Sequence, residues 1–167
     1  MKELLDLVYC EFCKFRRRSI FVMATLAALV FPIVMTALYW NIPTQVSYDN
    51  LFSGIVDYGY FLLLLPILTV IATSLFFIEQ DNDTLKNLVT IPVSKGKIVM
   101  AKIGVMAIVA VAYSLTSFFA GVICSAILGI PMDHMVQKFV LSVALGLMLL
   151  IATLPCVALV VWFNKSD

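Results

Sequence analysis

The sequence has 167 residues, of which 63% are hydrophobic and only 13% are charged. A water-soluble domain of this length cannot bury so much apolar surface, and a disordered chain is far more polar. The 11 basic residues nearly balance the 10 acidic ones, whereas a nucleic-acid-binding protein needs a basic surplus. The composition therefore predicts an integral membrane protein that does not bind nucleic acid.

The first predicted element is an amphipathic helix over residues 1–18, lying in the membrane interface. At about 100° per residue its apolar side chains share one stripe, formed by Leu4, Leu5, Val8, Phe12 and Phe15. The helix either only anchors the chain or also contacts a cytoplasmic partner, and its pattern is compatible with both. Cys10 and Cys13 form a C-x-x-C motif on its polar face, but no second pair completes a zinc site. The role of these two cysteines stays open.

Four long uncharged stretches follow, at about residues 20–39, 58–78, 103–127 and 139–163. A helix of about 20 apolar residues crosses the hydrocarbon core of a bilayer. The stretches do not alternate in polarity, as strands of a membrane barrel would. We therefore predict an all-α membrane protein with a single transmembrane domain over residues 1–167 and four spanning helices. No Asp, Glu, His or Lys falls inside these stretches, which argues against ion coupling or catalysis at depth.

The distribution of positive charge predicts the orientation. All but one of the 11 Lys and Arg residues flank one side of the predicted spans: Lys2, Lys14, Arg16, Arg17, Arg18, Lys86, Lys95, Lys97, Lys102 and Lys165. Lys138 alone lies on the other side. Because positive residues stay in the cytoplasm, both termini and the 79–102 loop are predicted to be cytoplasmic. The 41–57 loop and the turn around residues 131–134 then face outward from the cell membrane.

Two features of the spans concern packing. The third span carries small residues three and four positions apart, on one helix face: Ala107, Ala110, Ser114, Ser117 and Gly121. Small side chains let membrane helices approach closely, so we predict a helix-packing seam, with a substrate groove as the alternative. Pro32, Pro66 and Pro155 each lie inside a span and predict kinks there.

The 79–102 loop contains a predicted short helix. Asp83 or Thr84 can cap its first turn, and Pro92 stops it. Leu85, Leu88 and Val89 form its apolar face, while Lys86, Asn87 and Thr90 form the other. Such a helix, held between two spans, either receives a push from a partner or rests on the lipid.

Several motifs of this loop resemble those of a known family. An acidic residue ends the second span. It is followed by Asp83-Thr84-Leu85-Lys86-Asn87-Leu88, then by Pro92-Val93-Ser94-Lys95, and then by Lys102. The chain thus resembles the permease subunits of type-two ATP-binding cassette exporters, most closely the bacterial branch linked to bacitracin and lantibiotic self-protection. The helix before the first span and the short outer turn between the third and fourth spans agree. The sequence departs from that family in having Asp83 where glycine is common, and in four predicted spans where members usually have six.

The resemblance implies a division of labour between subunits. Asp83 to Leu88, with Pro92, would form the coupling helix that docks on a separate nucleotide-binding subunit. ATP and Mg would bind there, so no catalytic residue, cofactor or metal is expected in this chain. Two permease protomers, as a homodimer or heterodimer, would enclose a path for an antimicrobial peptide, drug or lipid-like substrate. The alternative is a non-transporting membrane adaptor or immunity protein that binds another membrane component.

Overall fold

The computed structural model describes residues 7–13, 20–40, 47–81 and 95–163. Within these ranges the chain is helical, and no β-strand occurs. A helix over 7–13 is followed by α2 (Ile20–Tyr39), α3 (Tyr48–Gly59), η2 (Tyr60–Leu64), α4 (Leu65–Asp81), α6 (Lys95–Leu128) and α7 (Met135–Phe163). The predicted all-α class with an N-terminal helix is confirmed.

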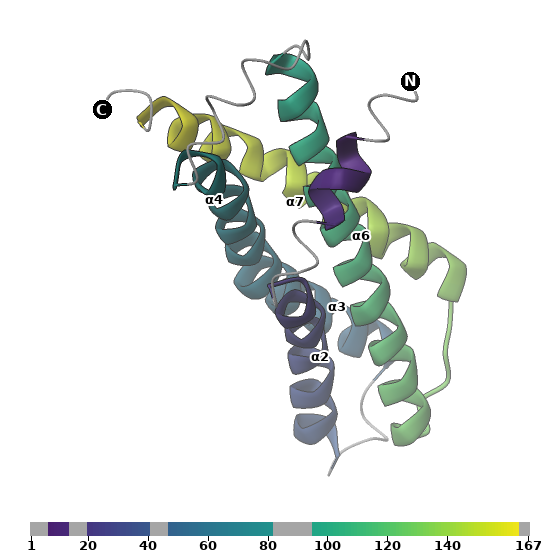
Figure 1. Ribbon diagram of the computed structural model, residues 1–167. Coiled ribbons are helices and arrows are strands. Elements are labelled where there is room, and N and C mark those ends of the chain that lie inside the picture. Colours follow the sequence, from purple (N-terminus) through teal and green to yellow (C-terminus); the bar gives the residue numbers. More distant parts are fainter. Residues whose placement is uncertain (1–6, 14–19, 41–46, 82–94, 164–167) are drawn as a thin grey trace.

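Four helical segments are long and apolar enough to cross a membrane: Phe21–Tyr39, Tyr48–Leu75, Gly96–Leu128 and Met135–Cys156. They pack as a bundle in which α7 crosses the others obliquely (Figure 1). We call one end of the bundle the Lys102 end; it carries helix 7–13 and the beginning of α6. The Lys138 end carries Tyr48 and the beginning of α7. The number of spanning helices agrees with the four uncharged stretches of the sequence.

The second and third spanning helices begin earlier than predicted. The second begins at Tyr48, inside the segment expected to be an outer loop up to residue 57. Ser47 caps it, accepting a hydrogen bond from the Asp49 amide at 3.2 Å. One face of α3 is buried in the bundle and consists of Tyr48, Leu51, Phe52, Ile55, Val56 and Gly59. The polar residues between them made the segment look like a loop, although they only form the exposed face of an amphipathic helix.

The third spanning helix, α6, begins at Lys95, within the predicted 79–102 loop. Its 34 residues, at about 1.5 Å each, extend over roughly 51 Å. This exceeds the ~30 Å hydrocarbon thickness, so α6 extends beyond the hydrocarbon layer. Lys102 consequently belongs to a spanning helix and not to a loop.

A π-helical turn, η2, joins α3 to α4 in one continuous helix. The Leu65 amide donates to the Tyr60 carbonyl, five residues back. Pro66 follows directly; it has no N–H, and in an α-helix its ring would clash with the carbonyl of Leu62. The wider π turn accommodates both constraints. A π turn thus precedes Pro66, whereas α2 and α7 continue as α-helices on both sides of Pro32 and Pro155.

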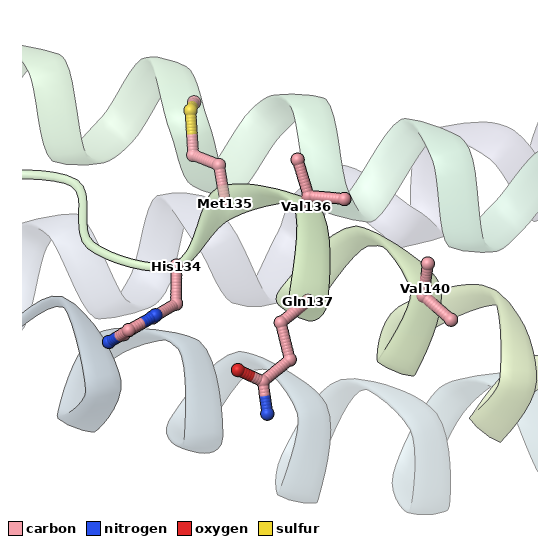
Figure 2. Close-up of a pocket in the computed structure, with 5 residues that line it drawn as sticks. All are labelled: His134, Met135, Val136, Gln137 and Val140. Atoms are coloured by element: carbon pink, nitrogen blue, oxygen red, sulfur yellow. The ribbon is translucent and has the colours of Figure 1, made fainter.

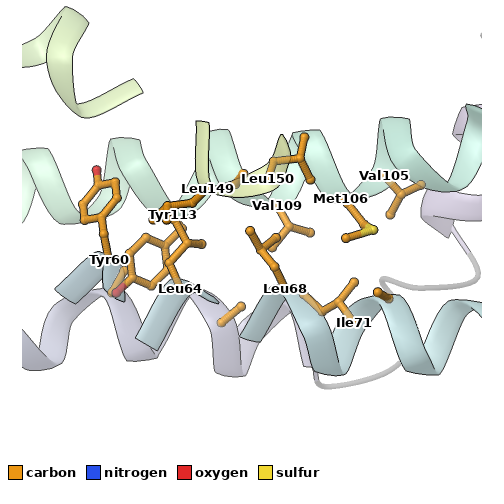
Figure 3. Packing of buried hydrophobic residues seen from close by; sticks show 14 of the residues in the cluster. Tyr60, Leu64, Leu68, Ile71, Val105, Met106, Val109, Tyr113, Leu149 and Leu150 are labelled. Atoms are coloured by element: carbon orange, nitrogen blue, oxygen red, sulfur yellow. The ribbon is translucent and has the colours of Figure 1, made fainter. Parts of the chain in front are cut away.

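The main core lies between the second spanning helix, α6 and α7. Figure 3 shows its side chains meeting from three directions: Tyr60, Leu64, Leu68 and Ile71 from η2 and α4, Val105, Met106, Val109 and Tyr113 from α6, and Leu149 and Leu150 from α7. Ala24 and Ala28 add α2 to this cluster. A second cluster, at the Lys138 end, contains Met35, Tyr48, Leu51, Ile55 and Ile130.

Outward faces of the helices are equally apolar. On α2 the exposed side chains include Val22, Met23, Leu26, Val30, Ile33, Val34 and Leu38. On α7 they include Val136, Val140, Leu141, Leu147, Met148, Ile151 and Leu159. Patches of this extent are unfavourable in water and suit hydrocarbon. The bundle is therefore built to sit in a bilayer.

Candidate functional site in the bundle interior

The inward face of α7 carries small and polar side chains along its length. Lys138, Ser142, Gly146 and Thr153 are all buried, and the first three are spaced four residues apart. This spacing places them on one face of the helix. The large hydrophobic side chains of α7 are exposed on its outer face, whereas these four residues are directed at protein and not at lipid. Small and polar groups of this kind hold membrane helices together.

At the middle of the bundle this stripe contacts the π turn. The Tyr60 and Ser142 hydroxyl oxygens lie 2.6 Å apart. Ser142 also donates to the Ser114 carbonyl of α6 at 3.3 Å. The Tyr113 hydroxyl donates to the Gly59 carbonyl at 2.8 Å, and the rings of Tyr60 and Tyr113 meet edge to face at 5.7 Å. Three helices are thus joined by hydrogen bonds in a region without bulk water, where such bonds are electrostatically stronger than in water.

At the Lys138 end, α7 is tied to α3. Lys138 forms an ion pair with Asp49, and its Nζ lies 3.9 Å from the centre of the Tyr48 ring and 5.8 Å from that of Phe52. The Lys138 side chain is 9% exposed, whereas that of Asp49 is 69% exposed. The charge of a buried ammonium is therefore balanced by a carboxylate at the surface, and the ammonium also makes a cation–π contact with an aromatic ring.

At the opposite end, Lys102 is also buried. Its Nζ donates to the Leu75 carbonyl of α4 at 2.6 Å. Helix 7–13 packs nearby, with Val8 against Gly104 of α6 and the Phe12 ring edge-to-face with Phe21 of α2 at 5.6 Å. Val8 and Phe12, two members of the predicted apolar stripe, thus pack against other helices of the protein. Leu4, Leu5 and Phe15 lie outside the described residues.

The residues of the predicted seam lie at contacts with two helices. Ala110, Ser114, Ser117 and Gly121 are buried, and Ala107 is half-buried against the main core. A Cβ atom added to Gly146 of α7 would collide with Ser114 Oγ, and one added to Gly121 would lie 3.2 Å from Ile55 Cδ1 of α3. The backbones of α6 and α7 therefore approach closely at Gly146, whereas Gly121 makes room for the end of the Ile55 side chain. A role for this face in transport remains a prediction.

The predicted coupling residues lie outside the described residues: Asp83, Thr84, Leu85, Lys86, Asn87, Leu88 and Pro92.

Cys10 and Cys13 are exposed on helix 7–13, Cys156 is exposed on α7, and Cys124 is buried. Within the described ranges, no group of three or more His, Cys, Asp or Glu side chains is placed to hold a metal ion.

A shallow cavity of about 570 Å³ opens at the beginning of α7. Figure 2 shows the residues that line it: His134, Met135, Val136, Gln137 and Val140. The side chains of His134 and Gln137 point to one side, whereas Met135 and Val136 point away from them. All the lining residues lie between His134 and Val140, so the cavity does not form a path through the bundle.

The sequence analysis located the uncharged spans but did not predict that the helices extend beyond them. It therefore missed that Asp49 and Lys102 lie inside spanning helices. Two signals could have located such extensions. Ser47 is followed by apolar residues at helical spacing (Tyr48, Leu51, Phe52 and Ile55), which predicts that a helix begins there. Asp49 then lies within that helix. Lys138, Ser142 and Gly146 also share one face at a spacing of four.

The bundle, its apolar exterior and its polar interior define a polytopic α-helical membrane protein. A family profile described as ABC-2 family transporter protein matches residues 7–167, so the chain belongs to that family. Proteins of this family are the membrane components of transporters, and in general they act with an ATPase partner and as permease dimers. Searches of curated proteins and of solved structures returned no match. The family resemblance inferred from the loop motifs is confirmed, while its bacitracin and lantibiotic branch remains a prediction.

Proposed function

We propose that this chain is the permease subunit of an ATP-driven exporter in a bacterial cell membrane. The family match carries the proposal, because it runs over residues 7–167 and takes in all four membrane-spanning helices. The arrangement of charge supports it as well. Among the described residues of the spanning helices, Lys102 and Lys138 lie toward the ends of the bundle, and Asp49 and Asp57 lie on the exposed face of α3. A carrier driven by ion gradients needs ionisable groups at depth.

In this proposal both termini and the Lys102 end face the cytoplasm, as the positive-inside rule predicts. A separate nucleotide-binding subunit, with ATP and Mg, docks on the coupling helix formed by residues 83–88 and Pro92. A second permease protomer completes the substrate path. The proposal is supported at this end by α6, which begins at Lys95 and extends beyond the hydrocarbon layer.

The proposed cargo is an antimicrobial peptide, drug or lipid-like molecule, and its export would protect the cell from an antibiotic. This assignment is supported by the loop motifs of the bacitracin and lantibiotic branch. The apolar helix faces also suit a cargo that partitions into lipid. A strongly charged solute would find few partners on them.

The first test is purification of the tagged protein from its native membrane in mild detergent. We expect a stoichiometric ATP-binding protein to be recovered with it. Recovery without such a protein would contradict the transporter assignment and favour the adaptor or immunity alternative.

The second test addresses coupling. The double substitution Leu85→Asp/Leu88→Asp places charge on the apolar face of the predicted coupling helix. We expect it to abolish export and cargo-stimulated ATPase activity while membrane insertion is retained. Thr90→Asp, on the opposite face, is the matched control and should export normally. Normal export by the double variant would remove the coupling role of this segment.

A further inference from the structure

The contact between the beginnings of α3 and α7 is the basis of one further inference. We propose that Asp49, Lys138 and the Tyr48 ring form a latch, which closes the Lys138 end of the bundle and separates when α7 moves away from α3. The closing role depends on the structure alone. The separation during transport rests on the proposed function.

The latch joins the first turns of two helices that are distant in the chain. Asp49 lies in the first turn of α3, and Lys138 lies in the first turn of α7. The Lys138 ammonium is held from two directions, by the Asp49 carboxylate and by the Tyr48 ring 3.9 Å away. Any movement of this end of α7 away from α3 has to break both contacts.

Behind the latch lies the second apolar cluster. Tyr48, whose ring contacts the ammonium, is itself a member, and Leu51 is fully buried one turn further into α3. Met35 of α2 and Ile130 of the turn before α7 close the same cluster. Separation of the latch would open a path from the aqueous side to Leu51.

The chemistry of the contact suits repeated opening. Asp49 is already exposed, so its carboxylate is hydrated in both states. Lys138 is in the first turn of its helix, and its long side chain can reach water when α7 moves. Ion pairs with one exposed partner and cation–π contacts near a surface are individually weak. The contact is therefore strong enough to bias the closed state and weak enough to be reversed.

The two charges should respond unequally to substitution. Asp49→Asn leaves a buried ammonium without its counter-ion, which is strongly unfavourable. Lys138→Met leaves an exposed carboxylate, which water solvates. The double variant Asp49→Asn/Lys138→Met should therefore be less open than Asp49→Asn alone. Mere loss of apolar packing would not produce this order.

The experiment measures access to position 51. Leu51→Cys is introduced after Cys10, Cys13, Cys124 and Cys156 have been replaced by Ser or Ala. The full chain is placed in lipid nanodiscs, so both faces are reachable, and the labelling rate with a charged, water-soluble maleimide is recorded. Leu64→Cys, fully buried at the π turn, and Ser53→Cys, exposed on α3, give the protected and accessible references.

In the Leu51→Cys background, we expect Asp49→Asn to raise the labelling rate about tenfold, the change that corresponds to 1.4 kcal/mol. Lys138→Arg, which keeps the charge and the aromatic contact, should leave the rate unchanged. The double variant should fall between Asp49→Asn and the parent. Equal rates in all variants would overturn the latch, whether or not the protein transports anything.

A second arm tests separation during transport. Asp49→Cys and Lys138→Cys are joined by a bifunctional maleimide that spans the two positions, in the complex with its ATPase. We expect export to be lost on cross-linking, while the same pair capped with a monofunctional reagent still exports. Undiminished export by the cross-linked complex would overturn the separation step. If the uncross-linked complex shows no ATP-dependent export, the proposed function fails. The closing of the Lys138 end by the latch is judged separately, from the labelling rates of Leu51→Cys.

Discussion

The hydroxyl groups of Tyr60 and Ser142 lie 2.6 Å apart in the interior of the bundle, although 82 residues separate them in the chain. Tyr60 opens the π turn that precedes Pro66, and Ser142 lies one turn after Lys138 on the inward face of α7. The pair thus joins the irregular part of the second spanning helix to the fourth. It satisfies two hydroxyl groups at a depth where water does not reach.

Removing either hydroxyl should destabilise the protein, and the effects should not add. We expect Tyr60→Phe and Ser142→Ala to show a coupling free energy of about 0.6–2 kcal/mol, the range found for hydrogen bonds between membrane helices. Denaturant unfolding in mixed micelles, analysed as a double-mutant cycle, measures it. Tyr60→Phe combined with Thr36→Val, whose hydroxyl bonds within α2, should give additive effects. Additivity of the Tyr60 and Ser142 variants would mean that the two groups do not interact.

The hydroxyl of Tyr113 should stabilise the boundary of the π turn. Tyr113→Phe removes its bond to the Gly59 carbonyl, and we expect a loss of about 1 kcal/mol in the free energy of unfolding. Tyr58→Phe is the matched control, since Tyr58 is exposed and stacks on Phe31. The two variants are compared by thermal unfolding in detergent. Equal stability would show that the Tyr113 hydroxyl contributes nothing at this boundary.

Close approach of α6 and α7 should make Gly146 sensitive to a single methyl group. A Cβ there would collide with Ser114 Oγ and lie 3.4 Å from the Ala110 carbonyl oxygen. We expect Gly146→Ala to cost about 1–3 kcal/mol, as overpacked cores do. Adding Ser114→Ala should recover part of the loss, because it removes the oxygen in the way. Gly96→Ala, with no atom within 4 Å of the added Cβ, should be tolerated.

The four cysteines should differ in reactivity. A water-soluble maleimide is expected to modify Cys10 and Cys13, which are exposed on the surface of helix 7–13. Cys124 is buried and should remain unmodified. Cys156 is exposed on an apolar helix face, where surrounding lipid should limit its contact with a water-soluble reagent. Mass spectrometry of the labelled protein in nanodiscs counts the modified sites. Rapid modification of Cys124 would contradict the packing of α6.

Sided labelling tests the predicted orientation with the same two residues. In intact cells a membrane-impermeant reagent should leave Cys10 and Cys13 unmodified, because the positive-inside rule places them in the cytoplasm. Opened membranes should permit modification. Labelling from outside intact cells would reverse the proposed topology.

Two charged residues in the second spanning helix, Asp49 and Asp57, show why a hydropathy pattern alone misplaces the start of a helix. The uncharged runs indicated all four spans. For the second span, however, the uncharged run begins only after Asp57, whereas the helix itself begins at Tyr48. Asp49 and Asp57 interrupt the hydropathy of α3, yet both lie on its exposed face. A membrane helix needs an uninterrupted apolar run only where lipid surrounds it. Where the end of such a helix reaches the interface, water and lipid headgroups can solvate polar residues on its exposed face.

The sequence by itself determined that the chain is helical and lies in a membrane, because each long apolar run has to satisfy its own backbone hydrogen bonds in lipid. It also determined the number of spans, whereas the packing seam on the small residues of the third span stays a prediction. Only the tertiary structure decided which polar groups meet. Lys138 with Asp49, and Tyr60 with Ser142, come from helices far apart in the chain. Their pairing depends on how those helices rotate and cross, which side-chain packing across the whole bundle fixes.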